Sequence, residues 1–340
     1  MKNQRSEQQV ARRKKRNRIL LICLAILALT GSFYIYQMWN ALAKGHDSNA
    51  TKSDLRQKQV EIGKDPFTVL LMGVDSRTAK GEKESWRPDV LMIATINPAK
   101  KSASIVSIPR DTRTTITHTN GWKDKINSAA TWGREKGIDP VSNVRLTVES
   151  FLEGVPIDYY AKINFQGFMD VVNQLGGVDV DVKRAFTYRS FNDKIIHFRL
   201  GPMHLNGEEA LAYVRMRKQD PEGDHGRNRR QQEVINQLLD KLTGVQVLTK
   251  FTSLTEIVGN NFSYSFSPSE IPTLASIYRS IPKESLKHIT IQAPSERING
   301  IWYDLVSQKE RDRVSNLLKK ELDLPYDQNK IEVPQMKKTN

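Results

Sequence analysis

Three stretches of this chain decide its fold: FTVLLMGV at residues 67–74, VLMIATI at 90–96 and SASIVSI at 102–108. They are rich in β-branched residues and almost uninterruptedly apolar, which is typical of strands covered on both faces. Residues 97–101 (NPAKK) predict a tight turn, and residues 76–88 are polar without a helical period. Because neither link contains a crossover helix, the three strands are predicted to be antiparallel neighbours in one central sheet.

This arrangement brings polar residues to a single edge of the sheet. In an antiparallel meander, the end of the first strand, the start of the second and the end of the third lie side by side. Asp75, Asp89, Arg110 and Asp111 occupy these positions. The sequence therefore predicts that two motifs far apart in the chain, GVDSR and SIPRDT, meet at one rim.

The rest of the chain alternates helical and strand-like segments, which is typical of an α/β fold. Asn206 and Glu209 have the spacing of a capping box for a helix ending near Arg215. We expect one α/β domain over residues 66–325, in which helices cover both faces of a mostly antiparallel or mixed sheet. The expected helices are 126–136, 143–152, 165–175, 206–215, 231–242, 268–278 and 307–322, and the further strands are 159–163, 178–182 and 288–292.

The run YVRMRKQDPEGDHGRNRRQQ, residues 213–232, is rich in arginine. If the part after Pro221 is helical, Arg227, Arg230 and Gln231 continue the apolar stripe that begins at Val234. Arg229 falls on the opposite side, where an ordinary surface ion pair with Glu233 is sufficient to explain its presence. Burying a guanidinium group is costly unless an anion meets it, so the pattern predicts a partly buried anion.

Arg215 and Arg217 lie at the start of that run. Two residues apart, they would point to different sides of a continuous helix, but both can face one ligand where a helix passes into extended chain. The following Asp220-Pro221 favours such an ending. The alternative is a solvated basic helix end that satisfies the last carbonyl groups.

Asp75 and Asp89 are candidate ligands of Mg²⁺, which often takes one or two carboxylates together with substrate phosphate. Each aspartate alone is more often a turn or cap residue. Two neighbouring carboxylates repel each other, so a cation or an arginine must sit between them. Arg110 and Asp111, taken alone, are equally compatible with an ordinary surface ion pair.

The N-terminus predicts a membrane anchor. Residues 1–18 carry +7 of the net charge of +14, and residues 19–36 are uncharged. We expect a cytoplasmic tail (1–18), a transmembrane signal-anchor (19–39), an extracellular tether (40–65) and a disordered tail (326–340), which places the domain outside the plasma membrane. A cleaved signal peptide is the alternative, since residues 41–43 (ALA) resemble a cleavage site.

Composition excludes several classes of site. The single cysteine, Cys23, lies within the apolar segment, so the exported part has no disulfide, thiolate metal site or cysteine nucleophile. Basic residues are not interleaved with aromatic ones, which argues against a nucleic-acid partner. The basic tail suits anionic lipid headgroups. The sequence leaves the oligomeric state open.

Seven motifs in order resemble the LytR-CpsA-Psr family of Gram-positive envelope proteins over residues 67–242: GVDSR, WRPD, SIPRDT, KINSA, NFQGFMDVVNQLGGVDVDV, LNGEEALAYVRMR and DHGRNRRQQ. The resemblance implies a phosphotransferase. Such an enzyme moves an anionic glycopolymer, such as wall teichoic acid, from undecaprenyl diphosphate to the muramic acid 6-hydroxyl of peptidoglycan.

The resemblance also implies roles for individual residues. Asp75 and Asp89 match the acids linked to Mg²⁺, and the catalytic set adds Arg110 and Asp111. The implied diphosphate-binding residues are Arg77, Arg87, Arg110, Arg215, Arg217, Arg227 and Gln231. Pro88 departs from the family pattern of Ser or Thr and puts Arg87 in doubt more than Asp89. Asp111 or Asp224 is the expected acceptor of the hydroxyl proton, and residues 151–175 could line a prenyl tunnel.

Other functions stay open at this point. A non-catalytic organiser of the envelope would bind polyprenyl phosphates or polyanions and would tolerate loss of Asp75 and Asp89. A phosphatase or pyrophosphatase would use water in place of the sugar hydroxyl. A transcriptional regulator conflicts with a cytoplasmic tail of only 18 residues.

Overall fold

The computed structural model describes residues 22–331 except 23, 24, 27, 34, 38, 49, 51, 76–85, 191, 218, 245 and 246. The predicted basic tail, residues 1–18, lies outside the described part of the chain, as do residues 332–340 and part of the predicted anchor. Among the described residues, no helix combines the length and the apolar character needed to cross a membrane.

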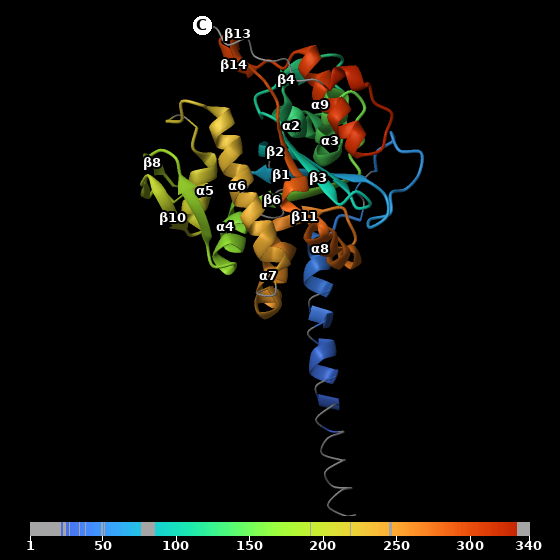
Figure 1. The fold of residues 1–340 in the computed structure, drawn as a ribbon, viewed down its shortest axis with the longest axis vertical. Helices are drawn as coiled ribbons and strands as arrows, with labels where there is room; N and C mark the ends of the chain where they lie inside the picture. Colours follow the sequence, from blue (N-terminus) through green and yellow to red (C-terminus); the bar gives the residue numbers. More distant parts are fainter. Residues whose placement is uncertain are drawn as a thin grey trace, which may run out of the picture.

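A six-stranded mixed sheet forms the centre of the domain (Figure 1). The strand order is β11 (Phe262–Tyr264), β6 (Tyr159–Asn164), β1 (Phe67–Val74), β2 (Pro88–Asn97), β3 (Ser102–Ser107) and β12 (Leu286–Thr290). As predicted, β1 pairs antiparallel with β2, and β2 with β3. The outer strands make the sheet mixed, because β6 runs parallel to β1 and β12 runs parallel to β3.

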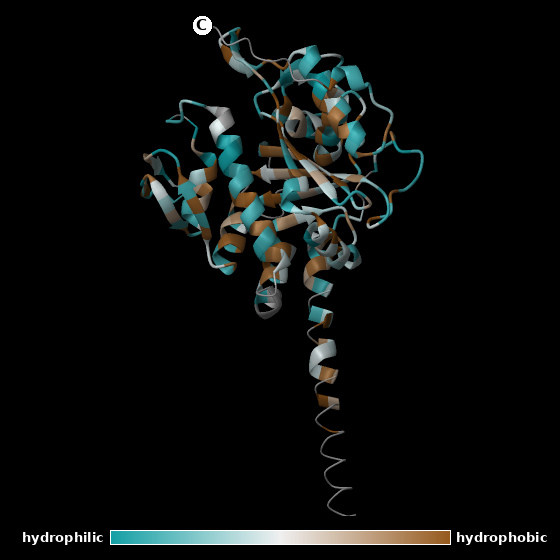
Figure 2. Cartoon of the chain, viewed as in Figure 1, coloured by the Kyte–Doolittle hydropathy of each residue, from teal (hydrophilic) through white to brown (hydrophobic). Residues whose placement is uncertain are grey.

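Helices cover both faces of this sheet, as expected. On one face, Leu70 and Met72 of β1 share a core with Val148 and Val314 of two covering helices. Burial of such side chains contributes about 1.5–3 kcal/mol each. The helices on this side are α2 (Ala129–Glu135), preceded by the 3-10 turn η2 (Ile126–Ser128), α3 (Pro140–Phe151) and α9 (Gln308–Glu321). Figure 2 shows hydrophobic residues concentrated on the central strands.

The other face is less tightly filled and positions the site. The helices there are α4 (Phe165–Gln174), α5 (Gly207–Arg215), α6 (Asp224–Thr243), α7 (Val247–Asn261) and α8 (Ile271–Ser280). The predicted capping box of α5 is present, since Asn206 and Glu209 bond reciprocally. Helix α6 begins at Asp224, seven residues before the expected start at 231, so Arg227, Arg229 and Arg230 are part of the helix.

The described residues also form four two-stranded sheets. The sequence predicted only one of their strands, at residues 178–182. The sheets are β4 (Arg113–Thr115) with β5 (Lys123–Lys125), β7 (Val178–Val182) with β10 (Gly201–Leu205), β8 (Phe186–Arg189) with β9 (Ile195–Phe198), and β13 (Ser295–Ile298) with β14 (Ile301–Asp304). Further 3-10 turns are η3 (Pro268–Glu270), η4 (Lys283–Ser285) and η5 (Gln328–Lys330).

The described part of residues 40–65 lies against the domain. The Tyr264 hydroxyl donates to the Leu42 carbonyl at 2.7 Å, and Leu42 is buried. Arg56 forms a two-point bond with Asp158 at 2.9 Å. The segment expected as a tether is therefore docked. At the other end, the expected tail from 326 is described as far as Ile331, and Lys330 pairs with Asp312 of α9 at 3.0 Å.

Candidate active site

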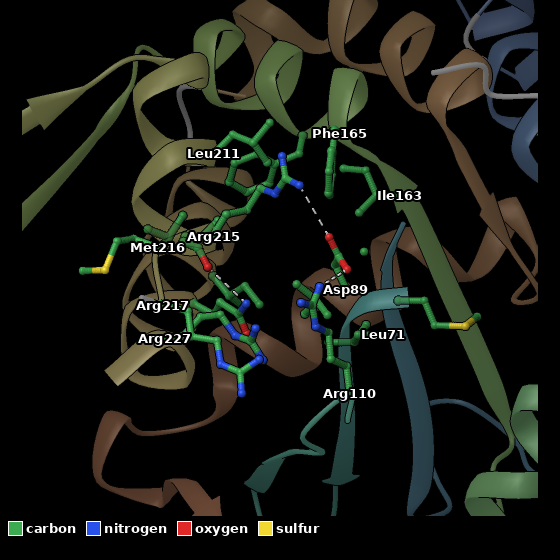
Figure 3. Close-up of a pocket in the computed structure, with 18 of the residues that line it drawn as sticks. Leu71, Asp89, Arg110, Ile163, Phe165, Leu211, Arg215, Met216, Arg217 and Arg227 are labelled. Carbon is green, nitrogen blue, oxygen red and sulfur yellow. Dashed lines mark hydrogen bonds and ion pairs between the residues drawn. The ribbon is translucent and has the colours of Figure 1, made fainter. Parts of the chain in front are cut away.

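A cavity of about 1100 Å³ opens between the sheet and helices α4, α5 and α6. Its inner wall is apolar and includes Leu71 and Ile163 of the sheet and Val234, Leu238 and Leu242 of α6. Four of the arginines that the sequence singled out, Arg110, Arg215, Arg217 and Arg227, line its mouth (Figure 3). The site therefore joins a lipid-like interior to a cationic rim.

The rim forms where the strand ends converge, as the meander predicted. Arg110, after β3, pairs with Asp89 at the start of β2. Arg215, at the end of α5, lies 3.8 Å from Asp89 and 3.9 Å from Asp75. Figure 3 shows Arg110 and Arg215 approaching Asp89 from opposite sides. An arginine thus occupies the position between the two carboxylates.

The end of α5 delivers two arginines to the same mouth. Met216 adopts an extended conformation (φ −60°, ψ 131°), which ends the helix. Arg215 lies with its guanidinium carbon 4.4 Å from the centre of the Phe165 ring, and Arg217 donates to Asp111 at 3.0 Å. The prediction that both arginines face one site from a helix end is confirmed.

Asp111 is the most strongly held acid of the site. Its carboxylate contacts Lys125 at 2.8 Å, Arg217 at 3.0 Å and Arg110 at 3.9 Å. Burial raises its pKa, but the Lys125 hydrogen bond and the three positive charges outweigh that effect and lower the pKa below its usual 3.8. Asp111 is therefore ionised near neutral pH and holds the surrounding cations in place.

Lys125 was not among the expected site residues. It lies at the end of β5 and lines the cavity. The only signal for it in the sequence is its place as the first residue of KINSA, a motif that carried the family resemblance without a stated role.

Helix α6 turns Arg227, Arg230 and Gln231 inward, as predicted, and all three are buried. Arg227 and Gln231 line the cavity. Arg230 instead meets an anion from the chain itself, because it pairs with Asp220 and donates to the Tyr213 carbonyl at 3.0 Å. Arg230 is therefore paired within the chain, whereas Arg227 lines the cavity in which a bound anion would lie.

Arg229 lies on the exposed side, as expected, but with another partner. It pairs with Glu222 at 2.6 Å, so the expected pair with Glu233 is wrong. Glu233 accepts from the Tyr213 hydroxyl at 3.0 Å and from the Asp181 amide at 3.1 Å.

Four candidates do not line the cavity in the described part of the chain. Asp75 is exposed and lies at the edge of the cavity, 3.9 Å from Arg215. Arg77 falls within residues 76–85, outside the described residues. Arg87 is exposed and does not line the cavity. Asp224 begins α6, and its side chain is outside the description.

The donor set at the rim fits Mg²⁺ only together with a ligand. Asp75 and Asp89 both reach the same Arg215 nitrogen, so a cation can lie between them. The described residues hold no group of three or more His, Cys, Asp or Glu side chains arranged as a metal site. Two hard oxygen donors suit a Mg²⁺ ion that also takes water and phosphate oxygens.

An α/β fold with an apolar cavity behind an arginine rim has the chemical character that suits an amphipathic anion. The model of the LytR_cpsA_psr family matches residues 32–320. The chain therefore belongs to the LytR-CpsA-Psr family, as the motifs predicted.

Proteins similar to this chain include named teichoic acid transferases. Over 322 residues the chain is 38% identical to the polyisoprenyl-teichoic acid–peptidoglycan teichoic acid transferase TagU of Bacillus subtilis, covering 92% of this chain and 98% of the relative. A crystal structure of B. subtilis TagV is 36% identical and covers 77% of this chain and 99% of its own (TM-score 0.65). B. subtilis TagT, solved with bound octaprenyl pyrophosphate lipid, is 28% identical and covers 82% and 98% (TM-score 0.62).

Proposed function

We propose that this protein is a phosphotransferase that moves an anionic glycopolymer, wall teichoic acid in the first instance, from undecaprenyl diphosphate to the muramic acid 6-hydroxyl of peptidoglycan. One observation carries the proposal: the apolar cavity opens at a rim where Arg110, Arg215, Arg217 and Arg227 gather. A prenyl diphosphate has the same two-part character, an apolar chain and an anionic head. The relatives named as teichoic acid transferases support this choice of substrate.

The proposed reaction is a single displacement at phosphorus. The acceptor hydroxyl oxygen bonds to the polymer-side phosphorus, while the bond from that phosphorus to the bridging oxygen breaks. The electron pair leaves with undecaprenyl phosphate, and the hydroxyl proton ends on that phosphate, whose second pKa is about 6. The protein's task is to hold the groups in line and to offset the charge on oxygen.

The residues divide this task. Arg110, Arg217 and Arg227 offer planar donor forks to phosphate oxygens. Asp111 keeps Arg217 and Lys125 in place, because its carboxylate contacts both. Its lowered pKa makes it a weak proton acceptor, so we assign it to positioning.

Mg²⁺ is part of the proposal. Asp75 and Asp89 would hold it, and when bound it would offset the negative charge of the diphosphate. Arg215, which contacts both acids, would then turn toward the ligand.

We also propose the location derived from the sequence, a single N-terminal anchor in the plasma membrane with the domain outside. In Figure 1 the described N-terminal helical residues extend away from the domain beside α7. The cavity reaches Leu242 near the end of α6 that precedes α7, so its apolar end lies on the anchor side.

The test uses the full-length chain in detergent with synthetic lipid-linked teichoic acid, Mg²⁺ and isolated peptidoglycan. We expect polymer covalently attached to peptidoglycan, and loss of the product in EDTA and in Asp89→Asn. An organiser would bind the lipid and yield no product. A phosphatase would release prenyl phosphate at the same rate without peptidoglycan, and either result would overturn the proposal.

A further inference from the structure

A second, smaller cavity adjoins the first at its mouth. It measures about 290 Å³ and shares Arg217 and Gly223 with the large cavity. Its remaining wall mixes apolar side chains, such as Pro109 and Ile291, with the hydrogen-bonding groups of Asn228, Ser295 and Asp304. The proposed phosphoryl transfer needs a place for an acceptor, and this cavity is not used by the lipid.

The β13–β14 hairpin borders both cavities and carries an exposed tryptophan. Trp302 lines the mouth of the large cavity although its side chain is 57% exposed. Its neighbour Tyr303 is buried, with Arg113 and Lys125 5.7 and 5.8 Å from its ring centre. A large aromatic ring left in solvent beside a site is typical of a surface that binds a partner.

The hairpin is fixed to the reactive rim. The Asp304 amide donates to the Asp111 carbonyl at 2.9 Å, and Thr112 forms a bridge with Asp304. Trp302 is therefore held in a constant position relative to the residues that contact Arg217. A ligand resting on Trp302 would be positioned relative to the phosphate site as well.

The geometry of an in-line displacement also favours an acceptor that binds beside Trp302. In-line displacement requires the attacking oxygen to lie opposite the leaving prenyl phosphate. The prenyl chain fits the apolar interior toward Leu242, so the hydroxyl must come from the side of Arg217 and Trp302. In Figure 1 the hairpin lies at the end of the molecule opposite the N-terminal helical residues. That end would face the wall.

We propose that Trp302 and the second cavity form the acceptor subsite, which binds a glycan strand of peptidoglycan. The inference rests on the proposed transferase function. The indole face packs against the C–H face of one sugar ring, and Ser295, Asn228 and Asp304 bond hydroxyl and amide groups of the neighbouring sugar. Acceptor choice is thus set by the hairpin, and carrier choice by the large cavity.

The experiment compares Trp302→Ala, Trp302→Phe and Trp122→Ala in the full-length chain. Trp122 is a matched control, because it is 59% exposed and lines neither cavity. We expect Trp302→Ala to raise the KM for soluble, uncrosslinked glycan strands about tenfold, with a much smaller change in kcat. Trp302→Phe should restore most of the affinity, and Trp122→Ala should behave as wild type.

Direct binding separates this inference from the proposed function. Glycan-strand binding is measured by calorimetry without any lipid substrate, and geranylgeranyl diphosphate binding is measured in parallel. Trp302→Ala should lose strand binding and keep diphosphate binding. Equal strand binding by Trp302→Ala and Trp122→Ala would overturn the acceptor subsite even if transfer proceeds. Absent transfer with intact, Trp302-dependent strand binding would instead overturn the transferase function alone.

Discussion

Arginines of α6 lie in sharply different environments although they are neighbours in sequence. Arg227 is buried and lines the cavity, whereas Arg229 is exposed and pairs with Glu222. We predict that Arg227→Ala lowers kcat/KM for transfer by about 10²- to 10³-fold, the usual effect of removing one donor to a charged transition state. Arg229→Ala on the same helix should leave the rate within about twofold, since a surface ion pair contributes little. Equal losses in both variants would refute a specific phosphate role for Arg227.

The lowered pKa of Asp111 predicts that the stability of the fold depends on pH. Its pKa in the folded protein lies below the unfolded value of 3.8, so the carboxylate stabilises the fold above about pH 4. That stabilisation is lost as the pH falls from 3.8 through the lowered folded pKa. Asp111→Asn should therefore lower the free energy of unfolding by about 1–3 kcal/mol at neutral pH, with a difference that shrinks below about pH 4. Melting temperatures across this range give the measurement, and a pH-independent difference would contradict the assignment.

Single residues of the site were predictable to different degrees. Asp89, Arg110 and Asp111 were placed together by strand order alone, because antiparallel neighbours must share an edge. The partner of Arg229 was predicted wrongly, and the partner of Arg230 was not predicted. Their anions, Glu222 and Asp220, come from the turn before α6, whose path is set by tertiary contacts rather than by helical period.

At the scale of elements, the contact between α4 and α5 positions Arg215. A Cβ on Gly207, the first residue of α5, would lie 2.2 Å from the Met169 carbonyl oxygen of α4. We predict that Gly207→Ala costs at least about 1–3 kcal/mol and lowers transfer, because α5 must shift and carries Arg215 with it. Gly244→Ala is the control, since its Cβ would meet only ordinary contacts at 3.5 Å. Chemical denaturation and transfer assays report the two effects, and unchanged stability of Gly207→Ala would refute the tight contact.

Most long, strongly patterned elements were predicted, with helix α7 as an exception, and short exposed ones were not. The central strands and helices α3, α4, α5 and α9 follow from apolar runs, caps and glycine stops. The β8–β9 and β13–β14 hairpins have strands of four residues each, mostly exposed, so they lack a hydrophobic period. Their pairing depends on neighbours in space, which is why Trp302 was not recognised.

For the molecule as a whole, the effect of filling the cavity on diphosphate binding should depend on the length of the prenyl chain. Ile235 lines the large cavity and is partly buried. We predict that Ile235→Trp weakens binding of a long polyprenyl diphosphate by about tenfold or more, because the added ring occupies the apolar interior. Isopentenyl diphosphate, which needs only the arginine rim, should bind as before. Calorimetric titration of both ligands checks this, and a parallel loss for the short ligand would show a disturbed rim instead.

The docked segment after the N-terminal helix has a geometric consequence. Leu42 and Arg56 are bonded to Tyr264 and Asp158, so little slack separates the proposed anchor from the domain. The reactive phosphate would then sit at a constant height above the bilayer. An enzyme held in this way can modify only the layer of the wall at that height, which makes newly made strands next to the membrane its acceptors and leaves older outer layers beyond its reach.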